Sequence, residues 1–99
     1  MIPLESVSHE TFAPLVGRAF TVMTSNGPVE LTLAGAKLLG HKRDEATRDP
    51  FSLAFRGPQA LRLPQGIYPF SCGDLGEIEF FITQVADGAK GSEFEAIFT

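Results

Sequence analysis

From residue 19 to residue 99, apolar side chains alternate with polar ones in short segments separated by Gly, Pro, Asn and Asp. This period of two is typical of strands with one buried face, because successive side chains of a strand point to opposite sides of the sheet. The alternating segments are residues 19–24, 29–35, 51–55, 67–72, 75–85 and 93–99. The sequence therefore predicts a mainly β fold, a small antiparallel barrel or sandwich of about six to seven strands. With 43% apolar residues, it is expected to form a single β-rich domain over residues 1–99.

The first two alternating segments are predicted to form a hairpin, because the turn-forming residues "SNGP" stand between them. With Asn26 and Gly27 at the centre of the turn, the expected cross-strand pairs are Thr24–Val29, Val22–Leu31 and Phe20–Leu33. Since Pro28 cannot donate the hydrogen bond that closes a tight turn, we expect a loop of about four residues here.

One short helix is predicted before the strands, over about residues 8–16. Ser8 would cap its start, and Gly17 suits the left-handed position that ends a helix. Its apolar face would consist of Phe12, Leu15 and Val16. Because Pro14 removes a backbone donor and crowds the preceding turn, the regular helix should run only to about residue 13 before it tightens.

Residues 55–70, "FRGPQALRLPQGIYPF", place three prolines and two glycines between two predicted strands. Proline fixes φ and glycine permits unusual backbone angles, so this segment is interpreted as a rigid crossing from one edge of a sheet to another. A ligand for a proline-reading module is the less favoured alternative, because such ligands need an exposed polyproline helix.

The charge balance argues against a nucleic-acid partner. The chain has 12 acidic and 8 basic residues, and the basic residues between Lys37 and Arg56 are interleaved with acidic ones, as in a solvated loop. No segment approaches the roughly 18 apolar residues that a membrane-spanning helix needs, and residues 1–20 lack the features of an export signal. We therefore expect no membrane span and a cytoplasmic location.

Few residues are suited to chemistry. His9 and His41 are the only histidines, and neither has a second ligand at helical or hairpin spacing, so no metal site is predicted. Ser8, His9 and Glu10 have the residue types of a catalytic triad, but adjacent residues at a helix start point apart. Cys72 is interpreted as a buried, inert thiol in a strand. Because no phosphate-binding or dinucleotide motif is found either, we expect no cofactor and favour a protein without catalytic activity.

The segments "SHETFAPLVGRAFTV", "RDPFSLAFRGP", "LPQGIYPF" and "LGEIEFFI" together resemble the pattern of a bacterial family of single-domain proteins of about this length. The resemblance extends from Phe12 to Phe98. It implies a protein of unknown function whose relatives are often found beside phage tail-collar-like proteins, and it brings no catalytic residues with it.

Two functional hypotheses follow. The first is a non-catalytic protein-binding or assembly module, such as an accessory of a phage-tail-like particle. The second is a small-ligand-binding β-barrel or an unrecognised hydrolase that uses the loop of residues 40–50, with His41, Arg43 and Arg56 as ligand contacts. The nine phenylalanines favour the first, because large rings fill the space that a ligand inside a barrel would need.

Phe81 and Ile97 break the polar pattern on the outer face of the last predicted hairpin and are candidate contacts for a protein partner or a second copy of the chain. If residues 86–92 form the loop, Val85 faces Glu93 and Phe81 faces Ile97. The predicted helix is the favoured cover for these two side chains, because it has an apolar face and no other obvious packing partner.

Overall fold

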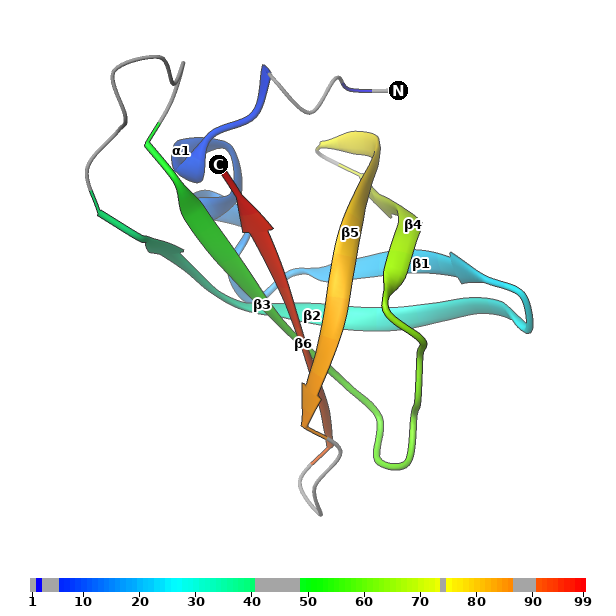
Figure 1. Cartoon of the computed structure of the whole chain (residues 1–99). Helices are drawn as coiled ribbons and strands as arrows, with labels where there is room; N and C mark the ends of the chain where they lie inside the picture. Colours follow the sequence, from blue (N-terminus) through cyan, green and yellow to red (C-terminus); the bar gives the residue numbers. More distant parts are fainter. Residues whose placement is uncertain (1, 3–5, 41–48, 74, 87–90) are drawn as a thin grey trace.

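The computed structural model describes residues 2, 6–40, 49–73, 75–86 and 91–99. Six strands close into an antiparallel barrel (Figure 1). They are β1 (Ala19–Thr24), β2 (Gly27–Leu38), β3 (Phe51–Gly57), β4 (Gly66–Cys72), β5 (Gly76–Ala86) and β6 (Ser92–Phe98). The helix α1 (His9–Phe12) and the 3-10 helix η2 (Ala13–Leu15) precede them. The predicted mainly β class is confirmed, and of the two predicted architectures the barrel is the one observed.

The order of strands around the barrel is β1-β2-β3-β6-β5-β4, and β4 pairs with β1 to close the ring. The chain therefore forms two antiparallel meanders, β1–β2–β3 and β4–β5–β6, that lie side by side. Residues 58–65 connect the meanders at the end of the barrel away from α1 (Figure 1). This is the crossing that the proline-rich segment predicts.

The first hairpin differs from its predicted register. The turn is formed by Ser25 and Asn26, and the observed pairs are Thr24–Gly27, Val22–Val29 and Phe20–Leu31. The tight turn is stabilised by Thr24, whose hydroxyl donates to the carbonyl of Gly27 at 2.6 Å and accepts from the N–H of Asn26 at 3.2 Å. Pro28 is tolerated because β3 pairs with β2 only from Thr32 onward, so the missing N–H leaves the β2–β3 ladder intact. The shift is two residues, so the predicted inward faces are unchanged.

The N-terminal helical segment tightens at Pro14, as predicted: α1 ends at Phe12 and the 3-10 turn η2 continues to Leu15. Gly17 follows at φ +93°, the left-handed conformation expected of it. The backbone N–H of Ser8 donates to Thr11 Oγ1 at 3.0 Å and so satisfies one of the free donors at the helix start. Val16, which the sequence placed on the apolar face, is exposed.

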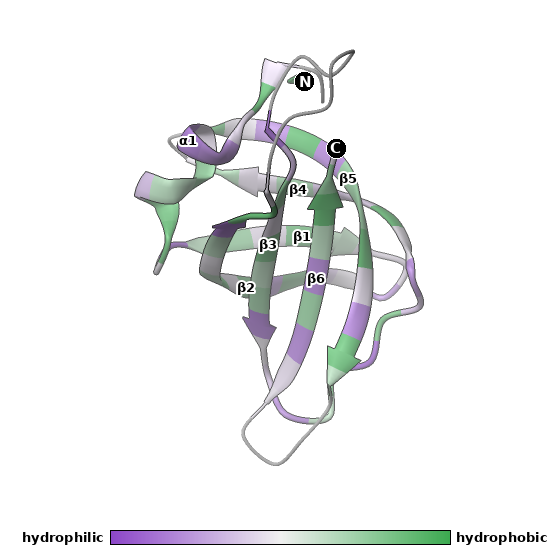
Figure 2. Ribbon diagram, turned by 60° about the vertical axis from the view of Figure 1, so that its left-hand side comes forward, coloured by the Kyte–Doolittle hydropathy of each residue, from purple (hydrophilic) through white to green (hydrophobic). Residues whose placement is uncertain are grey.

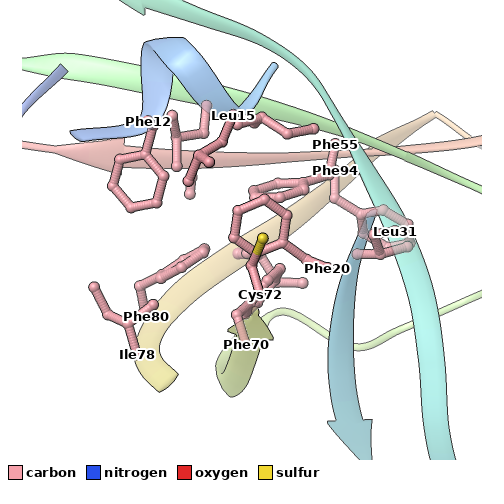
Figure 3. Packing of buried hydrophobic residues seen from close by; sticks show 14 of the residues in the cluster. Phe12, Leu15, Phe20, Leu31, Phe55, Phe70, Cys72, Ile78, Phe80 and Phe94 are labelled. Atoms are coloured by element: carbon pink, nitrogen blue, oxygen red, sulfur yellow. The ribbon is translucent and has the colours of Figure 1, made fainter. Parts of the chain in front are cut away.

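The barrel interior is filled by aromatic rings. Eight of the nine phenylalanines, all except Phe81, are buried. Figure 3 shows several of them packed together, including Phe55, Phe70 and Phe80. Phe70 and Phe80 stack with ring centroids 4.2 Å apart, and Phe51 and Phe98 stack at 4.6 Å. The fully buried Phe12 enters this core from α1 and has its ring within 6.4 Å of those of Phe51, Phe80 and Phe98.

The apolar face of the N-terminal helical segment therefore closes one end of the barrel, where β3 begins and β6 ends (Figure 1). Leu15 is buried beside Phe12 in the same core (Figure 3). The expectation that this helix covers Phe81 and Ile97 is wrong, since those two side chains remain 50% and 60% exposed. The physical reason is that an open barrel end offers a larger apolar surface to bury than two side chains on the outer wall.

The crossing segment is fastened to the opposite end of the barrel by Gln84 on β5. Its Oε1 accepts from the backbone N–H of Leu63 at 3.0 Å, and its Nε2 donates to the carbonyls of Leu61 at 2.8 Å and Ala86 at 3.3 Å. The amide side chain thus replaces the backbone partners that a neighbouring strand would supply. This fixes residues 61–63 although they form no strand.

Candidate functional site

Several large apolar side chains lie exposed on the strands of the barrel, among them Met23, Leu38 and Val85. Three others are Ile67 on β4, Phe81 on β5 and Ile97 on β6, with exposed fractions of 68%, 50% and 60%. They occupy three adjacent strands, and we call them the apolar strip. Ile67 and Phe81 are directly paired across β4 and β5. These three positions depart from the alternation of buried apolar and exposed polar residues along these strands.

The observed pairing of β5 with β6 begins at Thr83, which lies opposite Glu95. Phe81 and Ile97 each lie two residues beyond this pair, on adjacent strands. Their direct pairing stays a prediction from the sequence. The predicted Val85–Glu93 pair is wrong: a bulge after Gln84 sets Ala86 opposite Glu93.

The strip is bordered by carboxylates. Glu77 and Glu79 on β5 and Glu93 and Glu95 on β6 are all exposed, and the sequences of β4, β5 and β6 contain no Lys, Arg or His. Glu79 precedes Phe81, and Glu95 precedes Ile97, by two positions on the same outward face. Figure 2 shows the resulting alternation of hydrophobic and hydrophilic residues along β6. This wall of the barrel therefore combines an apolar centre with charge of a single sign.

Ile67 is the member of the strip that sequence reasoning missed. The outward orientation of Ile67 could be predicted, because Ile67 alternates with the inward Tyr68, Phe70 and Cys72. Its position beside Phe81 could not be predicted, because that depends on the order of the strands in the fold.

The second predicted site is only partly within the described residues. Arg56 lies exposed on β3, directly opposite Glu93 on β6 and Thr32 on β2. A surface hollow beside it is lined by Glu30, Thr32, Ala34, Arg56, Gly57 and Pro58. His41 and Arg43 lie outside the described residues. Of the three predicted ligand contacts, the structure thus places Arg56 alone, on the outer wall.

The side chains of Ser8, His9 and Glu10 have local structural partners. His9 Nε2 donates to the carbonyl of Ala36 at 3.2 Å, which ties α1 to β2. The pKa of Glu10 is below its ordinary value, because its own backbone N–H and then the Ser8 hydroxyl donate to the carboxylate. Both side chains are thus used in the local structure of the helix and its attachment.

Across the described ranges of the chain, no three His, Cys, Asp or Glu side chains gather closely enough to hold a metal ion. In the same ranges, no helix has the length and apolar character needed to cross a membrane.

Cys72 is buried at the end of β4, with 6% of its surface exposed, and its sulfur points into the core (Figure 3). We expect its thiol to react with a thiol reagent much more slowly in the folded protein than in urea, because the reagent must reach the sulfur through a packed wall. The measurement is the rate of labelling with a chromogenic disulfide, with and without denaturant. Equal rates in the two states would contradict the burial.

The fold and the strip define a class of protein: a small six-stranded antiparallel barrel with a filled interior and an exposed apolar strip on its wall. The family model described as Domain of unknown function (DUF6916) matches residues 7–98, and the chain belongs to this family. The match includes the whole range, Phe12 to Phe98, over which the sequence resembles a family of unknown function. No curated protein and no solved structure matches the chain.

Proposed function

We propose that the protein is a non-catalytic protein-binding module whose contact surface is the apolar strip. The observation that carries this proposal is the exposure of Ile67, Phe81 and Ile97 on three adjacent strands. The barrel does not need them for its core, because other residues of the same strands already fill the interior. Exposed apolar side chains that adjoin one another mark interaction sites more often than isolated ones do.

The filled interior disfavours the alternative of a ligand-binding barrel. A cavity for a small molecule requires empty space between the walls, whereas the rings of Phe55, Phe70 and Phe80 lie within 6.0 Å of one another inside this barrel. A hydrolase or ligand site that uses His41, Arg43 and Arg56 would have to lie on the outer wall, where Arg56 is. That alternative predicts that Arg56→Ala abolishes binding or turnover of a small molecule.

The resemblance to a bacterial family found beside phage tail-collar-like proteins supplies the partner class. On this proposal the chain is a cytoplasmic accessory that contacts a component of a tail-like particle during assembly. The test is co-expression with tail-collar-like proteins of the kind found beside members of that family, followed by size-exclusion chromatography. The wild-type chain is expected to elute together with one of them.

The variant Phe81→Ser separates a contact role from a structural role. Because half of the Phe81 side chain is already exposed, we expect the free energy of unfolding to fall by about 1 kcal/mol or less. Co-elution should be lost with Phe81→Ser and with Ile97→Ser. The matched control is Met23→Ser, at a site 49% exposed on β1, which should leave both stability and co-elution unchanged.

Two results would contradict the proposal. A loss of several kcal/mol on Phe81→Ser would mean that the strip belongs to the folded core. Unchanged co-elution of the strip variants would mean that the contact lies elsewhere on the molecule.

A further inference from the structure

We infer that the partner of the apolar strip is a basic amphipathic helix of another protein, one with a short apolar stripe flanked by Lys or Arg. This inference rests on the proposed function of the strip as a contact surface. It is drawn from the charges around the strip and from the spacing of its three side chains.

The charge around the strip has one sign. Glu79 and Glu95 each lie two residues from a member of the strip on the same outward face, a separation of about 7 Å along a strand. Glu93 differs from them, because Arg56 is directly opposite it on β3. The sequences of β4, β5 and β6 provide no cation to balance Glu79 or Glu95. A partner that brings Lys or Arg to these positions gains attraction that a neutral or acidic surface does not.

A second copy of the chain fits this surface poorly. A symmetric dimer places the same patch of each copy against the other. Pairing two such walls would bring Glu79 and Glu95 of one copy near those of its partner, and like charges across an interface oppose association. The same sign of charge opposes nucleic acids and anionic lipid surfaces.

The spacing of the strip suits a helix laid across the strands. Ile67, Phe81 and Ile97 lie on three neighbouring strands, and neighbouring strands are about 4.8 Å apart. Side chains three and four residues apart on a helix are separated by about 5–6 Å. A helix that crosses β4, β5 and β6 can therefore place one apolar side chain near each member of the strip, with basic residues on both flanks.

The experiment uses three synthetic helical peptides of equal length as probes. The first has a leucine stripe flanked by Lys, the second has the same stripe flanked by Glu, and the third has a serine stripe flanked by Lys. Titrations are followed through the backbone amide NMR signals of the folded protein at low ionic strength. We expect only the leucine–lysine peptide to shift the signals of β4, β5 and β6, and its affinity should fall as salt is added.

Charge-reversal variants test the rim. Glu79→Lys and Glu95→Lys should each weaken the leucine–lysine peptide by about tenfold at low salt and strengthen the leucine–glutamate peptide. Glu30→Lys is the matched control, because it changes the net charge by the same amount at an exposed position on β2, across the barrel from β5. It should change neither affinity by more than about twofold, since salt screens distant charges.

The outcomes separate this inference from the proposed function. If strip variants abolish binding while the Lys-flanked and Glu-flanked peptides bind equally, the basic partner is excluded and the contact surface stands. If the protein alone forms a dimer that Phe81→Ser dissociates, the occupant is a second copy and the inference is overturned. It is also overturned if none of the peptides binds. The proposed function is tested separately by the co-elution experiment. Unchanged co-elution of the strip variants would contradict it.

Discussion

Replacement of Phe12 by alanine is expected to lower the free energy of unfolding by about 3–5 kcal/mol, the cost of truncating a fully buried phenylalanine. The ring of Phe12 contacts those of Phe51, Phe80 and Phe98, which come from three different strands. Its loss leaves a cavity at the end of the barrel, and the surrounding rings are held by their own strands and can close it only partly. The measurement is urea denaturation followed by circular dichroism.

The matched control is Phe81→Ala, which removes the same ring from the outer wall. Phe81 is 50% exposed, so this variant should lose about 1 kcal/mol or less. If the two variants lose similar amounts, the helical segment does not close the barrel as described. If Phe12→Ala is neutral, Phe12 contributes nothing to the core.

Phe12 also illustrates what could be predicted from the sequence. Its place on the apolar face of a short helix follows from spacing, and the tightening at Pro14 follows from proline chemistry. The surface that this face covers does not follow, because periodicity gives no information on which strands end beside the helix. The order β3-β6-β5 decides that, and it depends on contacts between residues far apart in the sequence.

The first hairpin shows the same limit at the level of hydrogen bonds. The alternation correctly predicted that Phe20, Val22 and Leu31 point inward. The pairing was misplaced by two residues, and a loop of about four residues was expected because Pro28 cannot donate the hydrogen bond that closes a tight turn. The observed turn lies at Ser25 and Asn26, so the pair that closes it is Thr24 and Gly27 and no donor is needed from Pro28.

The candidate site was predicted only in part, because the sequence does not show which strands are neighbours. Phe81 and Ile97 were found as apolar residues at outward positions, which alternation alone can identify. Ile67 became part of the site only when the structure set it opposite Phe81. The position of Glu79 and Glu95 beside the strip likewise depends on the strand order, which alternation does not give.

Two glycines allow the chain to approach itself closely where β3 ends and β6 begins. A Cβ built at Gly91 would stand 2.7 Å from the carbonyl oxygen of Gly57, a separation that real Cβ atoms essentially never show. A Cβ built at Gly57 would stand 2.6 Å from Leu31 Cδ2 and 2.8 Å from Ser92 Oγ. Ser92 is fully buried here, and its hydroxyl donates to the carbonyl of Pro58 at 2.9 Å. The backbone at the start of the crossing therefore packs directly against the start of β6, with no room for a side chain between them.

Gly91→Ala is expected to lower the free energy of unfolding by about 2–5 kcal/mol, as the sum of two costs. Gly91 has φ +126°, where a side chain costs about 1–2 kcal/mol, and the contact with the Gly57 carbonyl adds about 1–3 kcal/mol, because a backbone oxygen in a paired strand cannot move aside. Gly27→Ala isolates the first cost, since Gly27 has φ +105° and open space around its Cβ position. Gly35→Ala should be nearly neutral, because Gly35 has neither a positive φ nor a close neighbour. The loss in free energy of unfolding should therefore be smallest for Gly35→Ala, larger for Gly27→Ala and largest for Gly91→Ala. A Gly91→Ala variant as stable as Gly27→Ala would mean that β6 can move away from the crossing without loss, contrary to the close packing around Ser92.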